Sequence, residues 1–396
     1  MYETSTSAAV SGTGVGELLQ IFLDGRGRTK SELAVLTGLS RNTVSARVDA
    51  LLAAQLLVPA GSEASSGGRP PAKIAFNSDA GAVLAVDLGA THATVAVTNL
   101  AAEVLELHSE ELAIADGPRP VLDRVFEVGE QLLSRHAAHR RLVGVGIGVP
   151  GPVEFATGRP INPPIMPGWD QFDVAGYTQQ RFPGPVLVDN DVNILALGEQ
   201  NLSWPDVDEL IFVKVATGIG AGIITGGALQ RGAKGVAGDI GHVQVPYSRD
   251  SPRPADDERS LAHLASGPAI AAELRTRGIL AEGSRDVVRL VHENDPVAVE
   301  ALRQAGRHVG EVLAMLVNTL NPSVIVIGGS VARAGEHLLA GIREVVYRKS
   351  RPVATQDLLI VPARAGDQGG VRGAATLVRQ RVLSPENVEA LVAGLV

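Results

Sequence analysis

The most informative stretch of the chain is residues 213–243, VKVATGIGAGIITGGALQRGAKGVAGDIGHV. It begins as an apolar strand, continues into the glycine-rich turn Thr217-Gly218-Ile219-Gly220-Ala221-Gly222, and leads to further apolar residues. Small residues in such a turn let backbone N–H groups approach a phosphate closely, although chain reversal alone explains any single turn. The stretch therefore predicts either a phosphate-facing loop or an ordinary connection between strands.

Two further turns of the same type lie on either side of this stretch. Asp87-Leu88-Gly89-Ala90-Thr91-His92 joins two apolar strands, and Gly328-Gly329-Ser330 follows an apolar strand and is expected to open a helix. The aspartate of the first turn is placed to orient a metal ion or a water molecule. Three such turns in order suggest a nucleotide cleft between two lobes, with the candidate nucleotide-binding residues Asp87, Gly89, Thr91, Thr217, Gly218, Gly220 and Gly328.

Apolar strands alternate with amphipathic helices from residue 82 onwards, which is typical of an α/β fold. We predict strands at residues 82–89, 93–100, 142–150, 186–190, 210–218, 323–329 and 358–363. One other motif is rejected. Gly146, Gly148 and Gly151 have the spacing of a dinucleotide-binding fingerprint, but Pro150 and Pro152 follow and no helix opens there.

The strand Val188-Asp189-Asn190-Asp191 ends in polar residues, and a helix is expected to follow from Val192 to Glu199. A carboxylate at that edge can accept a proton from a sugar hydroxyl, and Asn190 can bond neighbouring hydroxyls. The alternative is that the aspartate only caps the helix.

The first 78 residues have a different pattern, with three short amphipathic helices. Val15, Leu18 and Phe22 recur at helical spacing, as do Val44, Val48 and Leu51, and a short helix is expected around residues 31–36. Thr29 and Glu32 form a capping-box pair, and Gly38 followed by Ser40 supplies a helix end and a new N-cap. Two short strands, LLVPAG and PAKIAFN, then flank a Gly/Ser-rich loop. This order predicts a winged helix-turn-helix domain.

The third of these helices has the composition of a DNA-recognition helix. Its first turns carry small polar side chains and two arginines, which suit phosphates and base edges in the major groove. Arg69 in the loop is placed to enter a minor groove. We expect DNA contacts from Ser40, Arg41, Asn42, Thr43, Ser45, Arg47, Gly68 and Arg69. Because any three-helix segment with a polar surface resembles this picture, a protein-interaction or dimerisation module is the alternative.

Composition limits the possible functions of the chain. Its 396 residues carry a formal net charge of -8, so no global positive field attracts nucleic acid and any DNA contact must be local. The chain has 0 cysteines, which excludes disulfides, iron–sulfur clusters, thiol nucleophiles and thiolate zinc sites. No stretch has the roughly 18 apolar residues of a membrane helix, and the N-terminus does not resemble a signal peptide. We expect a cytoplasmic protein that does not contact membranes.

Taken end to end, the chain resembles transcriptional regulators of the ROK family, of the xylose-repressor and N-acetylglucosamine-repressor type. The resemblance rests on residues 213–243 above all, and on GVGIGVPGPVEFATG, PPIMPGW and GGVRGAATLV. It implies a winged helix-turn-helix at residues 1–78 and an actin-like (ribonuclease-H-like) sugar-kinase fold at 79–396. Within that fold, lobe one would span about 79–191 plus the C-terminal helix, and lobe two about 192–380.

The resemblance also implies roles for individual residues. Asn190 and Asp191 would bind sugar hydroxyls, with Asp191 in the place of the kinases' catalytic base. Asp239 and His242 stand where many family members have a sugar-binding glutamate and a zinc-binding histidine. The shorter Asp239 retracts its carboxylate by one methylene, which makes the sugar harder to infer. The family's cysteine positions are held by Arg253, Ala255 and Ser260, and its second carboxylate position by Ala262. We therefore expect no zinc and no other cofactor.

The turn Asp87–His92, the first candidate phosphate turn, differs from that of the kinases and resembles that of the family's regulators. At this turn the sugar kinases of the family have a sequence like Asp-x-Gly-Gly-Thr-Lys, whereas this chain has Ala90 and His92. The loss of a glycine and of a cation should weaken triphosphate binding, so we expect the nucleotide site to be vestigial. We expect a sugar- or sugar-phosphate-responsive repressor of carbohydrate genes, without catalytic residues, that binds an inverted-repeat operator in double-stranded DNA as a homodimer or homotetramer. The alternative is an ATP-dependent sugar kinase with a fused DNA-binding domain.

Overall fold

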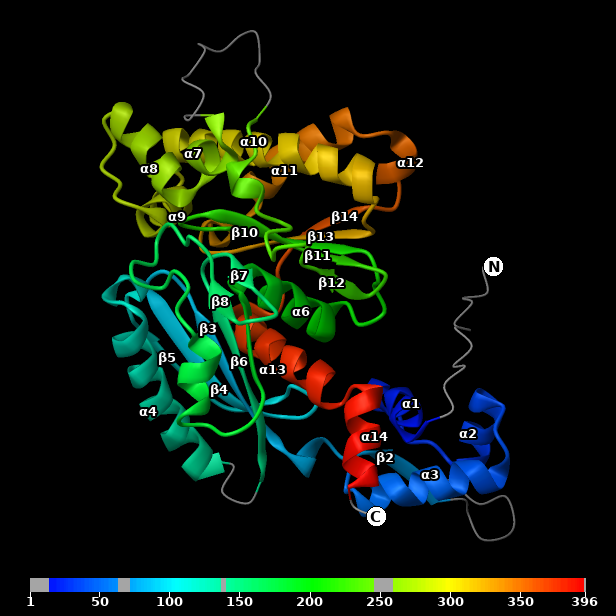
Figure 1. The fold of residues 1–396 in the computed structure, drawn as a ribbon. Helices are drawn as coiled ribbons and strands as arrows, with labels where there is room; N and C mark the ends of the chain where they lie inside the picture. The colour runs from blue at the N-terminus through cyan, green and yellow to red at the C-terminus, as the bar shows by residue number, and fades with distance from the viewer. Residues whose placement is uncertain (1–13, 63–71, 137–139, 246–258, 395–396) are drawn as a thin grey trace.

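A computed structural model describes residues 14–62, 72–136, 140–245 and 259–394. The chain forms three parts: lobe two lies at the top of Figure 1, lobe one below it, and the N-terminal domain at the lower right. Among the described helices, none combines the length and the apolar character needed to cross a bilayer.

The N-terminal domain has the predicted order of helices and strands. It comprises α1 (Val15–Gln20), η1 (Ile21–Asp24), α2 (Lys30–Thr37), α3 (Arg41–Ala53) and the antiparallel pair β1 (Leu57–Ser62) and β2 (Ala72–Phe76). The capping box of Thr29 and Glu32 is confirmed. Gly38 ends α2 in the left-handed region at φ 70°, and the Ser40 side chain accepts from the backbone N–H of Thr43 at the start of α3. These local signals place α3 across α2, with Val44 and Val48 fully buried.

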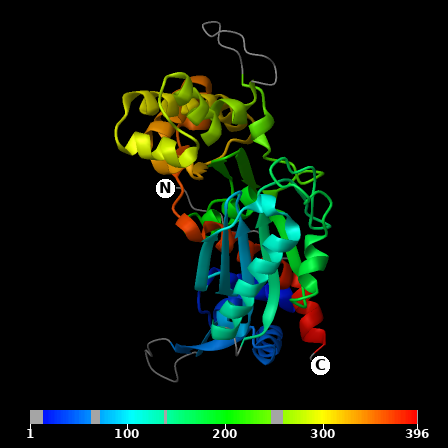
Figure 2. The same ribbon diagram turned by 90° about the vertical axis from the view of Figure 1, so that its left-hand side faces the viewer.

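The last helix of the chain, α14 (Pro385–Ala393), completes the core of this domain. Leu383 and Val388 are buried in one cluster with Leu18, Leu19 and Phe22. Figures 1 and 2 both place α14, in red, against the blue N-terminal helices. The predicted boundary at residue 78 was therefore incomplete. The physical reason is that α1 is only 6 residues long and leaves an apolar surface that α14 covers.

Lobe one is built on a five-stranded sheet in the order β5-β4-β3-β6-β9. The helix α4 covers one face, where Phe126 and Leu122 are buried against the sheet. The strand β5 was not predicted, because none of its side chains is fully buried and several are charged. The elements are η2 (Ser78–Ala80), β3 (Ala82–Leu88), β4 (His92–Asn99), β5 (Val104–Glu111), η3 (Ile114–Asp116), α4 (Pro118–His136), β6 (Leu142–Val149), β7 (Val153–Glu154), β8 (Arg159–Pro160), α5 (Val174–Gln179) and β9 (Val186–Asn190).

Lobe two is built on a second five-stranded sheet, in the order β12-β11-β10-β13-β14. Its elements are β10 (Leu210–Val215), β11 (Ile219–Thr225), β12 (Ala228–Gln230), η4 (Ile240–His242), α7 (Leu261–Ala265), α8 (Gly267–Thr276), α9 (Ser284–His292), α10 (Pro296–Leu320), β13 (Val324–Gly328), η6 (Val331–Ala334), α11 (Glu336–Lys349), α12 (Pro352–Thr355), β14 (Leu359–Pro362) and η7 (Gly366–Gln368).

Two of the three predicted glycine-rich turns differ from expectation. The strand β11 starts at Ile219, so Gly220 lies in a strand and pairs with Lys214 instead of forming a turn. Gly328 is the last residue of β13, and the segment after it opens only the 4-residue 3-10 helix η6. The prediction was wrong for Gly220 and Gly328 themselves, which lie in strands, because glycine was taken as a turn signal. The chain does turn beside them, at residues 216–218 and at Gly329.

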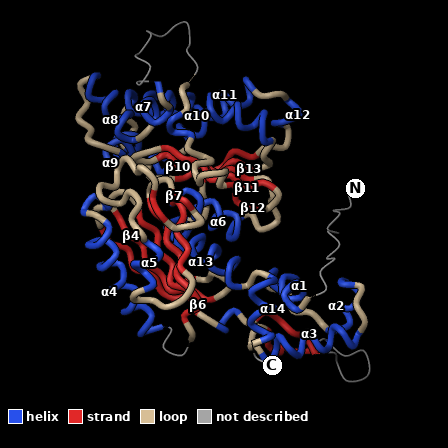
Figure 3. The backbone as a smooth tube through the Cα atoms, in the orientation of Figure 1, coloured by secondary structure: helices blue, strands red, loops and turns tan. Residues whose placement is uncertain are grey.

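Two helices, α6 (Asp191–Ser203) and α13 (Gly369–Val382), lie between the two sheets (Figures 1 and 3). They approach each other so closely that a Cβ on Gly373 would lie 1.6 Å from the carbonyl oxygen of Ile194. The side chains of α13 bury Val83 and Ala85 of lobe one. Lobe two therefore ends near β14 and not near residue 380, because α13 packs on the first sheet.

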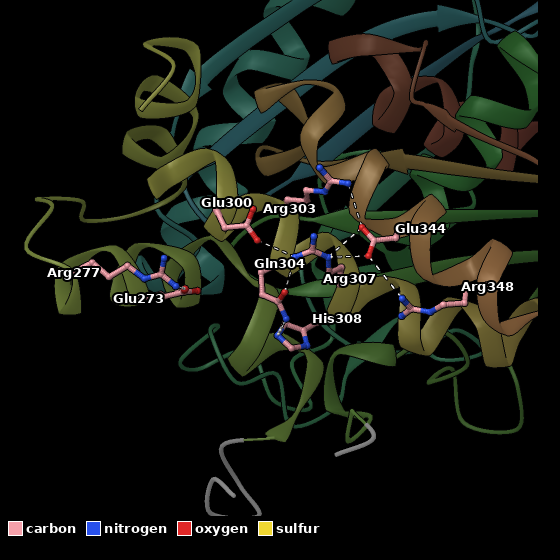
Figure 4. A network of polar contacts seen from close by, with 9 residues as sticks. All are labelled: Glu273, Arg277, Glu300, Arg303, Gln304, Arg307, His308, Glu344 and Arg348. Carbon is pink, nitrogen blue, oxygen red and sulfur yellow. Dashed lines mark hydrogen bonds and ion pairs between the residues drawn. The ribbon is translucent and has the colours of Figure 1, made fainter. Parts of the chain in front are cut away.

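Lobe two has a close-packed helix pair on its outer side, α10 and α11. A Cβ on Gly341 would lie 2.2 Å from the carbonyl oxygen of Arg303, so only glycine fits this crossing. Beside it, Glu344 of α11 accepts hydrogen bonds from Arg303 and Arg307 of α10 (Figure 4). The same figure shows Arg348 directed towards Glu344, at 3.8 Å.

Candidate functional site

The candidate ligand site lies where parallel strands of lobe one end together. Asp87 on β3, Gly148 on β6 and Asp189 on β9 are direct neighbours across the sheet. The carboxyl ends of parallel strands are the usual place for a ligand site in an open α/β sheet. Gly148 leaves room there for α6, because a Cβ on it would lie 2.2 Å from Cδ1 of Ile194 and 3.5 Å from the Cα of Asp191, where α6 begins. The fold thus gathers three carboxylates at one edge.

Lobe two contributes a lysine to the same place. Lys214 on β10 lies between Gly220 on β11 and Gly328 on β13 in the sheet register, so no neighbouring side chain crowds it. Its ammonium donates a hydrogen bond to Oδ2 of Asp191. The side chain of Lys214 is 20% exposed and that of Asp191 is 8% exposed, so the ion pair is largely withdrawn from water.

The electrostatics of this cluster follow from burial and from the ion pair. Burial raises the pKa of Asp87 to about 7, against the opposing effect of Lys214. Burial alone would lower the pKa of Lys214, but the carboxylates of Asp191 and Asp87 and the hydrogen bond to Asp191 outweigh it and raise that pKa. Lys214 therefore stays charged between the two carboxylates.

His92 lies over the first phosphate turn. A Cβ on Gly89 would be 2.1 Å from Cε1 of His92, so the imidazole packs directly on that glycine. Burial, aided by the neighbouring Lys214, lowers the pKa of His92 and keeps the ring neutral at neutral pH. Thr91, Thr217 and Gly218, three other predicted nucleotide-binding residues, are exposed at the turns.

Asn190 and Asp189 are engaged in contacts within the protein. The side chain of Asn190 caps α6 by accepting from the N–H of Val192, and its Nδ2 donates to the carbonyl oxygen of Gly151 at 2.8 Å. Asn190, and not an aspartate, is therefore the N-cap. Asp189 accepts from Nε of Arg231 at 2.7 Å and from Nδ2 of Asn193 at 2.7 Å. These contacts orient the polar edge of the sheet.

Arg231 connects the lobes at this edge. It comes from lobe two, bonds the buried Asp189, and stacks its guanidinium 3.8 Å from the ring centroid of Phe155 in lobe one. The sequence analysis missed both Lys214 and Arg231. A signal existed for the first of them, since a lysine inside the apolar strand LIFVKV is a charge that burial tolerates only when it is paired.

Asp239 and His242 follow Gly238, which approaches β11. A Cβ on Gly220 of β11 would lie 3.4 Å from Cγ1 of Val192, next to Asp191, and 3.9 Å from the carbonyl oxygen of Gly238, next to Asp239. His242 is 75% exposed and its Nε2 lies 3.9 Å from Oδ2 of Asp239.

Ser260, at one of the family's cysteine positions, caps α7 by accepting from the N–H of His263. Within the described residues, no three His, Cys, Asp or Glu side chains converge as metal ligands. Arg253 and Ala255 lie outside the described residues.

The predicted DNA surface is arranged around the first turn of α3. Arg41 and Asn42 are exposed there. Ser40 and Thr43 share a hydrogen bond between hydroxyls at 2.9 Å, so both stabilise the helix start. Arg47 is half-buried further along the helix. Gly68 and Arg69 lie outside the described residues.

Ser45 is tied into a contact that sequence reasoning did not anticipate. Lys30 of α2 donates to Oγ of Ser45 at 2.7 Å and to Oδ1 of Asp49 at 2.8 Å. This contact locks α2 against α3 and places a further cation beside the recognition surface. No pattern in the sequence pairs Lys30 with a helix 15 residues later, because the turn between the helices decides which faces meet.

Comparisons with known proteins agree with this architecture. The family model described as "ROK family" matches residues 83–381. The xylose repressor of Caldicellulosiruptor bescii is 28% identical over 384 residues, which cover 93% of this chain and 95% of that protein. The glucokinase of Halalkalibacterium halodurans is 29% identical and covers 76% of this chain and 96% of its own length. A solved ROK family transcriptional regulator, a homologue of the Escherichia coli Mlc protein, superposes with a TM-score of 0.81 at 25% identity, over 96% of this chain and 98% of its own.

Proposed function

The chain belongs to the ROK family, and from that premise we propose that it is a sugar-responsive, DNA-binding repressor of carbohydrate genes. One observation carries the proposal: a winged helix-turn-helix with an exposed first turn of α3 is packed, through α14, onto a sugar-kinase-like body. The similar xylose repressor covers 93% of this chain, whereas the similar glucokinase covers 76% of it.

In the proposed mechanism, the body senses the sugar and the N-terminal domain binds the operator. Two recognition helices of a homodimer, or of a homotetramer, would contact the half-sites of an inverted repeat in double-stranded DNA. The sugar must bind one conformation of the cleft more tightly than the other, and couplings of this kind are typically about 1–3 kcal/mol. We place the protein in the cytoplasm, where operator DNA lies, and assign it no zinc or other cofactor.

The arrangement of Lys214 supports a sensor over an enzyme. Asp191, in the place of the kinases' base, already accepts a hydrogen bond from the ammonium of Lys214. A general base must direct a lone pair at the hydroxyl that it deprotonates, and this cation occupies one side of the carboxylate. The cleft therefore suits recognition of hydroxyls better than their phosphorylation.

The test is enrichment and sequencing of fragmented DNA from the source genome on the purified chain, at near-physiological salt. We expect a few sites that share an inverted repeat beside sugar transport or metabolism genes, and release of those sites by one sugar of a panel. Enrichment of no site, with or without sugars, would overturn the proposal. In that case, ATP turnover that Asp191→Asn abolishes would favour a sugar kinase. No ATP turnover by the wild-type chain would favour an interaction module.

A further inference from the structure

We infer that Lys214 is the resident cation of the candidate ligand site: it takes the place that a divalent metal ion would hold beside Asp191 and Asp87, and it makes this place a site for an uncharged sugar. This inference rests on the proposed function only in calling the ligand a sugar. The charge at this place depends on the positions of three side chains, Lys214, Asp191 and Asp87.

The first step is the placement of the ammonium. Lys214 reaches across from the sheet of lobe two to the start of α6 and bonds Asp191. The glycines on both sides of it, Gly220 and Gly328, leave its stem unobstructed. On lobe one, the side chain of Asp87 lies against the start of α13, where a Cβ on Gly370 would lie 2.0 Å from Oδ2 of Asp87. The ammonium thus bonds Asp191, and its charge also acts on Asp87.

The second step is the exclusion of a metal ion. Two carboxylates from different elements are the oxygen ligands that Mg²⁺ and Mn²⁺ prefer. Here an ammonium that lies largely out of water already offsets the charge of Asp191, and Asp87, with a pKa of about 7, carries only part of a charge at neutral pH. A second cation at this place would be repelled by Lys214 at short range, where water screens little. A metal–nucleotide complex would meet the same obstacle.

The third step concerns anionic ligands. Near the cluster, Arg333 pairs with Asp367 at 2.6 Å and Arg231 pairs with Asp189 at 2.7 Å, and the lowered pKa of His92 keeps its ring neutral. Together with Asp87, Asp191 and Lys214 the cluster has no excess of positive charge. Phosphate groups are normally bound by charged donors such as unpaired arginines or lysines. A neutral hydroxyl suits the place better, since Asp191 accepts a hydrogen bond and Lys214 donates one.

The experiment titrates Mn²⁺ alone into the full chain and measures free Mn²⁺ by electron paramagnetic resonance. Wild type and Lys214→Arg should bind weakly. Lys214→Met should bind one equivalent at least about tenfold more tightly, because the carboxylates lose their counter-ion. The double variant Lys214→Met/Asp191→Asn should lose that gain. Equal Mn²⁺ binding by a folded Lys214→Met and wild type would overturn the inference, and thermal unfolding checks the fold.

A second measurement covers the case in which Lys214→Met does not fold. Inorganic phosphate is titrated into wild type and into Asp87→Asn/Asp191→Asn, and binding is followed by phosphorus NMR line broadening. Wild type should not bind phosphate, whereas the double variant should, because its ammonium is no longer neutralised. Phosphate binding by wild type that Asp87→Asn/Asp191→Asn does not strengthen would overturn the inference. Neither titration uses operator DNA, so a failure here is distinct from a failure to enrich operator sites.

Discussion

The side-chain amide of Gln20 in α1 donates a 2.7 Å hydrogen bond to the carbonyl oxygen of Leu383, 363 residues later in the chain. A second bond, from the backbone N–H of Gly16 to Oε1 of Glu389, joins the same two segments. The DNA-binding domain is therefore closed by the C-terminal end of the sugar-kinase-like body. A change in the position of α13, which leads into α14, would be transmitted directly to this domain.

Leu383→Ala should lower the free energy of unfolding of the N-terminal domain. Leu383 is 2% exposed within the core of that domain, and truncation of a buried leucine typically costs about 2–5 kcal/mol. Hydrogen exchange of the α1 and α3 amides measures the effect locally. Leu391→Ala is the matched control, since Leu391 lies on α14 but is 42% exposed. Equal protection of the α1 amides in the two variants would contradict this role of the segment from Leu383 through α14.

Arg41→Ala should weaken operator binding. Arg41 is exposed on the first turn of α3, where it can reach a base edge or a phosphate. Loss of a base contact costs about 1–3 kcal/mol and relaxes preference at one position, whereas loss of a phosphate contact lowers the salt slope by about one. Fluorescence anisotropy at several salt concentrations separates the two. Arg285→Ala, which removes an exposed arginine from lobe two, is the control, and an equal loss in both variants would argue against α3 as the recognition helix.

Asp87→Asn should change how stability depends on pH. The native pKa of Asp87 is about 7, whereas an unfolded aspartate titrates near about 3.9. Folding therefore takes up a proton between these values. The stability contributed by Asp87 is fully present below about pH 4 and is lost as pH rises through about 7.

The comparison is the urea midpoint of wild type and Asp87→Asn at acidic and at mildly alkaline pH. Relative to wild type, the variant should gain stability at the higher pH, by about 1–3 kcal/mol. Asp357→Asn removes an exposed carboxylate, and its difference in stability from wild type should not change with pH in this way. A constant difference between wild type and Asp87→Asn across the range would show that Asp87 is ionised in the native state throughout.

Gly341→Ala should destabilise lobe two. The added Cβ would lie 2.2 Å from the carbonyl oxygen of Arg303, so α10 and α11 must separate, and their bonds through Glu344 must lengthen. Overpacking of this kind typically costs about 1–3 kcal/mol. Thermal unfolding measures the loss. Gly283→Ala, where nothing lies within 4 Å of the added Cβ, is the control and should be near neutral. An unchanged Gly341→Ala would mean that the two helices are not in close contact.

Local signals in the sequence were sufficient for much of the fold. The capping box at Thr29 and Glu32, the left-handed Gly38 and the N-cap Ser40 each act within a few residues, so the helix-turn-helix could be predicted and is confirmed. The apolar runs predicted the central strands of both sheets, because burial on two faces leaves a nearly continuous apolar pattern. The polar edge strand β5 has no such pattern and was missed.

The sequence alone determined the family resemblance, the fold class, and the residues available for DNA and sugar contacts. Only the tertiary structure decided which of these residues meet. Gly220 and Gly328, which are predicted to bind a nucleotide, flank Lys214, and Lys214, which no motif marked, bonds Asp191. The same holds for α14, which belongs to the first domain although it is last in the chain. The physical reason is that local conformation depends on neighbours in sequence, whereas ion pairs and core contacts depend on crossings between distant elements, which no local pattern encodes.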